Sequence, residues 1–202
     1  MNFKIFVEGE ADLKFIKDFV KIQFNQELLK NDVIILGGWT GIIKEKDKFI
    51  INSGPNNDEG INLVILDADD ETNLGGFEKR KAELLAFKKE LKIEFELFLF
   101  PINNQNGDLE MLLSRIINPE NQEIFDCWNG FERCISSLKK EYTVPARKTK
   151  IYAYLEVLHG TTGSEKDKIK DRNRDFTKAE HWDLNHEQLL PLYNFLAPHF
   201  AA

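Results

Sequence analysis

Apolar runs of strand length recur through the first half of the chain, and turn-forming or amphipathic segments separate them. The runs lie at residues 3–9, 32–38, 62–67 and 93–101. Strands that alternate with helices predict an α/β fold with a parallel, right-handed, four-stranded sheet flanked by helices. The run at 62–67 is continuously apolar, which is typical of a strand covered on both faces. The run at 93–101 ends at a proline, which favours a place nearer the sheet edge.

Helical spacing of apolar residues marks the segments between and after these strands. Helices are expected over 11–30, 39–53, 75–91, 108–117, 121–142, 148–158 and 185–196. A glycine is expected to interrupt the helix at 121–142, and Pro191 to start or kink the last one late. Residues 160–175 predict a loop. No linker is evident, so 1–202 is expected to form a single domain, with an α/β core over 1–105 and a mostly helical continuation over 106–202 packed on it.

Composition places the chain among ordinary globular proteins, with 42% apolar and 30% charged residues. No apolar run is long enough to cross a membrane and the beginning does not resemble a signal peptide, so a cytoplasmic protein without a membrane partner is expected. The net charge of −7 argues against a protein that coats nucleic acid through a basic face. It does not exclude an enzyme that approaches phosphodiesters through bound metal. Cys127 and Cys134 are interpreted as packing residues.

Acidic residues follow two of the predicted strands. Glu8 and Gly9 end the first strand, and Asp12 opens its helix; Asp67 and Asp69 end the third. Ligands of parallel sheets bind outside the carboxyl ends of the strands, where the strand order switches. If the two strands are neighbours, the acids converge, with Asp67 and Asp69 on one face roughly 6.5 Å apart along the chain.

Carboxylates so close repel one another unless a cation neutralises them or they take up protons. Oxygen ligands at this density suit Mg²⁺ or Mn²⁺, and those ions serve phosphoryl transfer. The competing interpretation is a strand that simply ends in a solvated acidic loop. A second set of acids at the matching position of another strand favours the metal site.

Val7-Glu8-Gly9 with Asp12, followed by a hydrophobic strand into Asp67-x-Asp69, resembles the Toprim superfamily of topoisomerases, primases and small nucleases. The resemblance covers roughly residues 3–105. It implies a Toprim-like Rossmannoid sheet, Glu8 as catalytic acid/base or metal ligand, and Asp67 and Asp69 as a metal-binding pair. The chain is most similar to stand-alone proteins akin to the overcoming-lysogenization-defect (OLD) nucleases, in which further acids complete a two-metal site.

This similarity implies that Asp12, and Glu110 at the start of the helix after the fourth strand, bind metal as well. Glu110 is as readily explained as an acid that stabilises a helix N-terminus. Gly9 is a candidate for close approach to a phosphate, or for a plain turn. Lys148 and Lys150 are candidates for phosphate contact. The four histidines lack metal-site spacing and are interpreted as structural.

The resulting hypothesis is a Mg²⁺-dependent Toprim-type nuclease that hydrolyses phosphodiesters of nucleic acid. One alternative is a non-catalytic Toprim-fold module that binds metal structurally or serves as a partner subunit; a protein partner or a homodimer would fit it. The other is a haloacid-dehalogenase-like phosphatase with Asp67 as nucleophile, since the LVILDADDE stretch also resembles that family's strand. In that family the motif usually opens the fold, whereas here it lies on the third strand.

Overall fold

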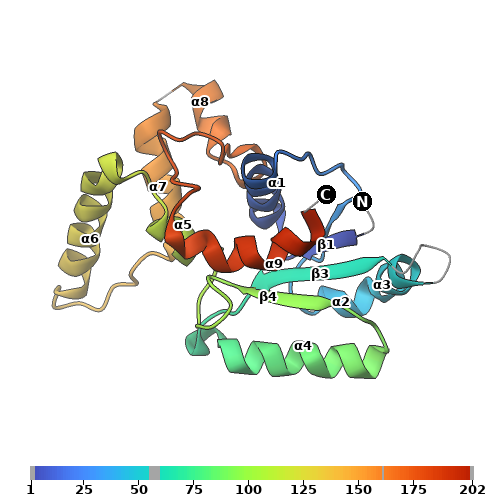
Figure 1. Cartoon of the computed structure of the whole chain (residues 1–202). Coiled ribbons are helices and arrows are strands. Elements are labelled where there is room, and N and C mark those ends of the chain that lie inside the picture. The colour runs from blue at the N-terminus through green and yellow to red at the C-terminus, as the bar shows by residue number, and fades with distance from the viewer. Residues whose placement is uncertain (1–2, 55–59, 161, 201–202) are drawn as a thin grey trace.

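The computed structural model describes residues 3–54, 60–160 and 162–200 of the 202-residue chain. Its centre is a four-stranded sheet of β1 (Phe3–Val7), β2 (Val33–Ile35), β3 (Ile61–Asp67) and β4 (Glu96–Phe100). The strands are parallel and ordered β2-β1-β3-β4 (Figure 1). The α/β fold with a parallel four-stranded sheet is therefore confirmed, and β4 lies at an edge as expected.

The strand order reverses direction at one place, and this place positions the acids. From β1 the chain moves to β2 on one side and then returns to β3 on the other side of β1. The carboxyl ends of β1 and β3 therefore flank the switch point of the sheet, where ligands of open α/β sheets bind. Val7 pairs with Ile65, so β3 continues two residues further to Asp67.

Two helical layers cover the sheet (Figure 1). One layer holds α2 (Gly41–Lys44), α3 (Lys46–Ser53) and α4 (Phe77–Leu91); the other holds α1 (Glu10–Phe24), α5 (Leu109–Arg115), α7 (Arg147–His159) and α9 (Leu190–Phe200). Alternate side chains of each strand enter opposite layers, as the two-residue strand period requires. On β1, Ile5 and Val7 face the second layer, and Phe6 stacks on Phe49 of α3.

The second half of the chain is mostly helical. Its remaining helices are α6 (Gln122–Ser136), α8 (Gly163–Lys168) and the short 3₁₀ turns η3 (Pro119–Asn121), η4 (Asp171–Asn173) and η5 (Glu187–Leu189), while η2 (Glu71–Asn73) follows β3. Two of the expected secondary-structure assignments were wrong. Gly130 does not interrupt α6, because one glycine costs a helix only about 1 kcal/mol. Part of the expected loop at 160–175 is α8, which begins at a capping box of Thr162 and Glu165.

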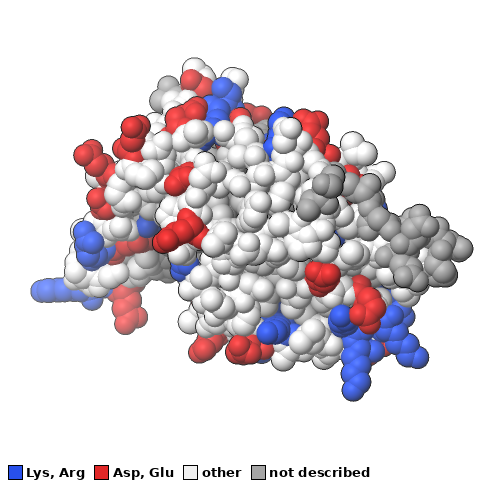
Figure 2. Space-filling view, in the orientation of Figure 1, with Lys and Arg blue, Asp and Glu red and all other residues white. Residues whose placement is uncertain are grey.

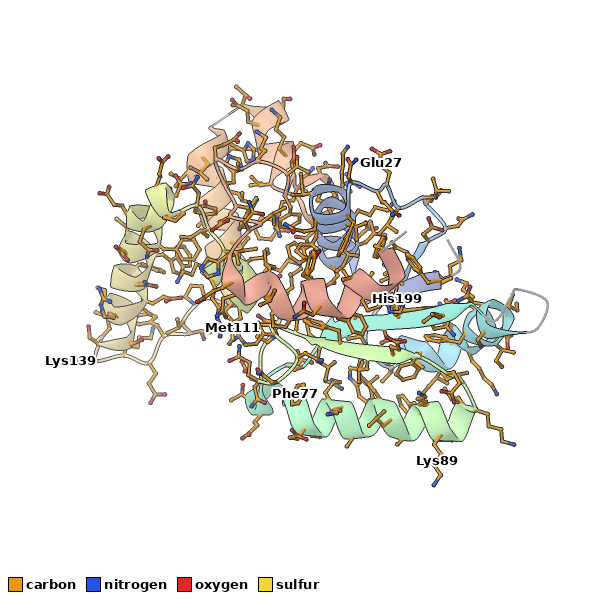
Figure 3. The ribbon with its side chains drawn as sticks, in the orientation of Figure 1. Glu27, Phe77, Lys89, Met111, Lys139 and His199 are labelled. Carbon is orange, nitrogen blue, oxygen red and sulfur yellow. The ribbon has the colours of Figure 1, made fainter. Side chains whose placement is uncertain are left out.

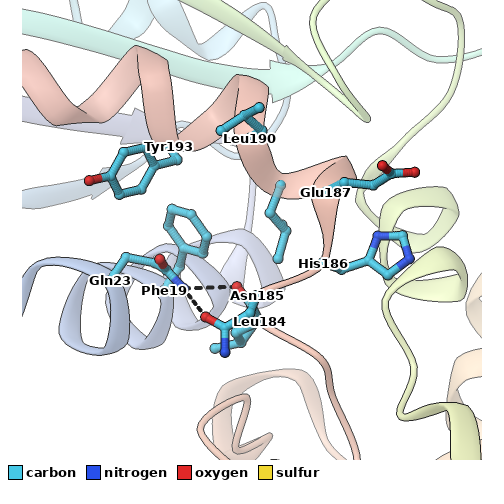
Figure 4. Close-up of a pocket in the computed structure, with 9 residues that line it drawn as sticks. Phe19, Gln23, Leu184, Asn185, His186, Glu187, Leu190 and Tyr193 are labelled. Carbon is cyan, nitrogen blue, oxygen red and sulfur yellow. Dashed lines mark hydrogen bonds between the residues drawn. The ribbon is translucent and has the colours of Figure 1, made fainter.

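The helical continuation packs on the sheet through a shared apolar core. Phe15 of α1 contacts Phe100 of β4 and Phe176 from the second half edge to face. The segment before α9 is also fastened to α1, because the amide of Gln23 donates to the carbonyl of Leu184 at 2.8 Å (Figure 4). A cavity of about 370 Å³ remains beside this contact, lined by α1 and α9. No helix in the described part is long and apolar enough to cross a membrane.

Candidate functional site

Four of the five acids predicted from the sequence come from four elements that meet at the switch point. Glu8 follows β1, Asp67 ends β3, Asp12 lies in the first turn of α1, and Glu110 lies in the first turn of α5. Like charge from Glu8, Asp12 and Glu110 raises the pKa of Asp67. The structure therefore brings these four carboxylates together. We call Glu8, Asp12, Asp67 and Glu110 the acid cluster.

Asp67 lies at the middle of the acid cluster. Its Oδ1 accepts a hydrogen bond from the backbone N–H of Leu109, the first residue of α5, at 2.9 Å. Burial raises the pKa of Asp67 well above its usual range, and the charges of Asp12 and Glu8 raise it further. A single backbone donor does not offset these effects, so the ionised form needs a cation.

Asp12 is the most deeply buried acid of the cluster, with 6% of its surface exposed. Its Oδ2 accepts the backbone N–H of Gly9 at 2.8 Å, which closes the N-terminus of α1. Burial raises the pKa of Asp12 to about 7, and the charge of Glu8 adds to the effect, although the bond from Gly9 opposes it. Asp12 therefore caps a helix and carries a proton that it releases near neutral pH.

Glu8 has a carboxylate oxygen without a partner. Its Oε2 is buried and accepts no hydrogen bond from any residue that the structure describes. Burial and the nearby charge of Asp69 raise the pKa of Glu8, although a backbone hydrogen bond with Asp67 opposes them. Burial also raises the pKa of Glu110, and the charge of Asp108 adds to the effect. Buried oxygens without donors are rare in native proteins and call for a ligand, a water or an ion.

Asp69 does not take the position that strand alternation predicts. Its φ is +60°, so the strand conformation ends before it, and its backbone pairs instead with Gly107. Its carboxylate accepts from Arg80 Nη2 at 2.8 Å, and the guanidinium of Arg80 lies 4.1 Å from the ring centroid of Trp39. The charge of Asp69 thus acts on Glu8, but Asp69 already forms an ion pair with Arg80.

Gly9 adopts an extended conformation, with φ of −147° and ψ of −170°, which any residue can adopt. Its N–H is occupied by Asp12, so in this state it is not free to bind a phosphate. An added Cβ would meet Asp12 Oδ2 at 3.6 Å, an ordinary contact. The structure therefore gives Gly9 the part of a plain turn residue rather than a phosphate contact.

Lys148 and Lys150 point to nearly opposite sides of α7 and have different surroundings. Lys148 donates to Asp171 at 2.6 Å, and its charge acts on Glu110 of the acid cluster. Lys150 donates to Asn129 on α6 at 2.6 Å and lies over the ring of Phe125, with no acid of the cluster among its contacts. The structure brings Lys148 to the edge of the cluster and leaves Lys150 outside it.

Three basic side chains that border the acids were not assigned from the sequence as contacts of this site. Arg80 pairs with Asp69; Arg147, at the start of α7, pairs with Asp70 and, at 3.0 Å, with Asp108; buried Arg174 acts on Glu110 by charge. Asp108, predicted to cap α5, does so by accepting the Met111 N–H. Sequence signals existed for Arg147, which adjoins Lys148, and for Arg174, which lies in the charged segment 164–175.

The donor set suits a hydrated hard cation. The described residues contain no group of three or more His, Cys, Asp and Glu side chains already gathered tightly around one point. Mg²⁺ needs no such cage, because it keeps several waters and binds through one or two carboxylates. All donors at the switch point are carboxylate oxygens, which Mg²⁺ and Mn²⁺ prefer over nitrogen or sulfur. These carboxylates fit a partly hydrated ion better than one held by protein ligands alone.

Comparison with known proteins assigns a family but no activity. A family model described as "Protein of unknown function (DUF3226)" matches residues 2–201. The chain belongs to this family. Neither the search of curated proteins nor the search of solved structures found a match. The match spans nearly the whole chain, so the sheet, the acid cluster and the helical continuation all lie within the region that defines the family.

Proposed function

We propose that this protein is a Mg²⁺- or Mn²⁺-dependent phosphodiester hydrolase that acts on nucleic acid. The observation that supports it best is the buried Oε2 of Glu8, which lacks a hydrogen-bond donor beside Asp12 and Asp67 at the switch point of a parallel sheet. Ligands bind at this position in open α/β sheets. Carboxylates that repel one another there are stabilised by a cation, and phosphoryl transfer uses that cation.

Each acid has a part in this proposal. Glu8 and Asp67 would bind one ion, and Asp12 and Glu110 would bind a second. Bound metal supplies positive charge to the phosphodiester and to the oxygens that attack and leave. Burial raises the pKa of Glu8 in the metal-free protein, and a bound cation would favour the ionised carboxylate that holds it.

Cations at the rim of the cluster would bind the substrate phosphates. Arg147 and Lys148 lie in the first turn of α7, whose backbone N–H groups also attract anions. Arg147 contacts Asp108, the cap of α5, and Lys148 acts on Glu110 in the same helix. A phosphate drawn to this turn would therefore lie beside the acid cluster, although the whole protein is negatively charged.

Removing one charge from the cluster tests the proposal. Asp67→Asn preserves the size of the side chain and an oxygen that can accept the Leu109 N–H. We expect it to abolish Mg²⁺-dependent cleavage of oligonucleotides and to weaken Mn²⁺ binding measured by calorimetry. The matched control is Asp47→Asn, an exposed acid at the start of α3, which should change neither. Wild-type cleavage by the Asp67 variant would refute the proposal.

A non-catalytic metal-binding module is the second candidate. It is favoured by the ion pair between Asp69 and Arg80, which occupies an acid that the Toprim resemblance assigns to metal. Calorimetry that shows Mn²⁺ binding to the wild type, together with no cleavage of DNA or RNA by it, would support this second function. The Toprim assignment itself remains a proposal, based on the order and placement of Glu8, Asp12, Asp67 and Asp69.

A further inference from the structure

One short segment has a positive net charge, although the protein as a whole is negative. Residues 133–150, from the last turn of α6 to the first turn of α7, contain six basic residues and one acid, Glu141, a net charge of +5. With −7 for the whole chain, the remaining residues carry −12. We call residues 133–150 the basic arm; its cations are Arg133, Lys139, Lys140, Arg147, Lys148 and Lys150.

The basic arm is the most exposed stretch of the second half. All residues from 136 to 144 are exposed, and Phe125 is the only buried residue of α6. Lys139 lies at the far end of this projection, away from the sheet (Figures 1 and 3). Neither Lys139 nor Lys140 forms an ion pair with any residue that the structure describes. Their charges are therefore available to an external anion.

Large apolar side chains are exposed among these cations. Phe131 is 44% exposed, Tyr142 is 50% exposed and Leu138 is 47% exposed. Lys140 Nζ lies 5.2 Å from the ring centroid of Tyr142. Exposed rings beside cations are the features that proteins use to bind single-stranded nucleic acid, because bases stack on the rings while cations contact phosphates.

A cavity opens at the base of the arm, between α6 and α7. It measures about 230 Å³, and its lining includes Trp128, Phe131, Tyr154 and Val157, with Lys150 as its only charged residue. Trp128 and Phe131 lie 5.3 Å apart between ring centroids. The cavity is smaller than the roughly 300–1,000 Å³ of sites that enclose drug-sized ligands, a size that suits one flat ring. Lys150, which lies outside the acid cluster, lines this cavity instead.

The arm leads directly to the acid cluster. Its C-terminal end is the first turn of α7, where Arg147 pairs with Asp70 and Asp108 and Lys148 acts on Glu110. Lys139 and Lys140 thus lie on the same short stretch of chain as Arg147, which borders the acid cluster.

Helix α4 is another lysine-rich surface, and it lacks exposed aromatic rings. Figure 2 shows blue side chains near the end of α6 and, well separated from them, at the end of α4. Among the described residues of α4, the one exposed large apolar side chain is Leu85, and no ring is exposed there. Charge occurs on both surfaces, but charge with exposed aromatic rings occurs on the arm.

We propose that the basic arm and the cavity at its base bind single-stranded nucleic acid and guide it to the acid cluster. The proposal rests on the proposed function, because it names the substrate class of that site. Duplex DNA fits less well, because its bases are paired and cannot stack on Phe131, Tyr142 or Trp128. The strand's phosphates would contact Lys139 and Lys140 and then Arg147.

Strand binding is measured without catalysis. The full-length protein in EDTA is titrated into fluorescein-labelled oligo-dT or oligo-rU, and anisotropy is recorded at several KCl concentrations. Lys139→Gln with Lys140→Gln should weaken binding roughly ten-fold at low salt and reduce the slope of log K against log[KCl] by about 1.4, because single strands release about 0.7 counterion per phosphate contact. The matched control, Lys89→Gln with Lys92→Gln on α4, removes the same charge from exposed positions and should leave the slope nearly unchanged.

Ring removal tests the stacking contribution. Phe131→Ala and Tyr142→Ala should each weaken strand binding by about five-fold or more, since a stacked base contributes about 1–3 kcal/mol. Neither should change the salt slope, because no charge is lost. Leu85→Ala on α4, an equally exposed apolar residue, is the control and should bind like the wild type. Circular dichroism confirms that each variant is folded.

Several outcomes would overturn the inference. These are equal weakening by the α4 control, tighter binding of duplex than of single strands, or preference for an acidic peptide over both. Failure of the proposed function is seen separately, in cleavage of bis(p-nitrophenyl) phosphate, a small diester that has no strand to guide. Metal-dependent cleavage of this diester by wild type and arm variants alike, with strand binding insensitive to the arm, would refute the inference alone.

Discussion

Asp171 and Asp67 differ in what surrounds their carboxylates. Asp171 accepts hydrogen bonds from Lys148 at 2.6 Å and from Tyr152 at 2.9 Å, and pairs with Arg174. Although burial alone would raise its pKa, these partners lower it. Asp67 accepts one backbone N–H, and burial together with neighbouring carboxylates raises its pKa. Burial would raise the pKa of both acids, and the hydrogen-bond and charge partners of each decide the direction of its shift.

The difference separates structural acids from functional ones. Asp171 has its cations within the fold, so its ionised form stabilises the native state without a ligand. The acid cluster lacks an equivalent set of cations in the described part of the chain, and an external cation would complete it. A cluster of perturbed carboxylates at a ligand-binding edge is a candidate functional site, whereas a satisfied ion-pair network is not.

Replacing Arg80, a cation that neutralises an acid within the fold, should give a large loss of stability. Its side chain is 3% exposed, pairs with Asp69 and Glu83, and stacks on Trp39. Arg80→Met removes the cation and leaves Asp69 without its partner, so we expect a loss of about 3 kcal/mol in the free energy of unfolding. Urea denaturation measures it. Adding Asp69→Asn should recover part of the loss, and a single variant as stable as the wild type would contradict the assignment.

Asp12 tests the uncompensated charge of the acid cluster. Because its pKa is raised to about 7, the metal-free protein should lose stability as pH rises from about 4 to 7, since the unfolded chain releases this proton first. Asp12→Asn stays neutral and can still accept the Gly9 N–H. We expect it to exceed the wild type by about 2–4 kcal/mol at pH 8 and to match it near pH 4.

Urea denaturation in EDTA at several pH values gives the Asp12 comparison, with Asp47→Asn as control. Under the proposed function, Mg²⁺ at pH 8 should stabilise the wild type more than the variant and so reduce the difference between them. A difference that is the same at pH 4 and pH 8 would show that the charge of Asp12 is not the cause.

Asp171→Asn should act in the opposite direction at neutral pH. Lys148 and buried Arg174 would lose the carboxylate between them, and we expect a loss of about 1–2 kcal/mol. Since the folded pKa of Asp171 is lowered, its contribution is present at neutral pH and lost as acid protonates the carboxylate. Asp167→Asn, a solvent-exposed acid paired with Lys170, is the control and should leave stability nearly unchanged. Stabilisation by Asp171→Asn would remove the contrast between the two acids.

The sequence predicted the sheet and the placement of four acids because both follow from local patterns. Apolar runs of strand length show where β1 and β3 end, and parallel strands bring their carboxyl ends to one edge. Glu8 and Asp67 were therefore placed together from chain positions alone. The same reasoning found the capping position of Asp108, since a short acid before an apolar stripe is a helix-start signal.

The features that the sequence did not predict depend on tertiary contacts or on single backbone angles. Strand alternation fails at Asp69 because φ there is +60°. The pairing of Arg80 with Asp69 and Trp39 joins residues distant in the chain, whereas the sequence of α4 indicates only a solvated charged side. Cys127 and Cys134 are exposed, contrary to expectation, because α6 packs on the body along a narrow face.

A buried histidine pair should give the smallest of the predicted changes in stability. His159 and His181 are 9% and 5% exposed, and their ring centroids lie 4.8 Å apart. Burial lowers both pKa values, so protonation disfavours the fold and stability should fall by about 1 kcal/mol as pH drops from about 6.5 to 5. Asp12 acts in the opposite direction over this range, so the measurement belongs in the Asp12→Asn background. There, His181→Phe should reduce the loss, and His186→Gln, a partly exposed histidine, should not. An unchanged pH slope in the His181 variant would assign the acid sensitivity to other groups.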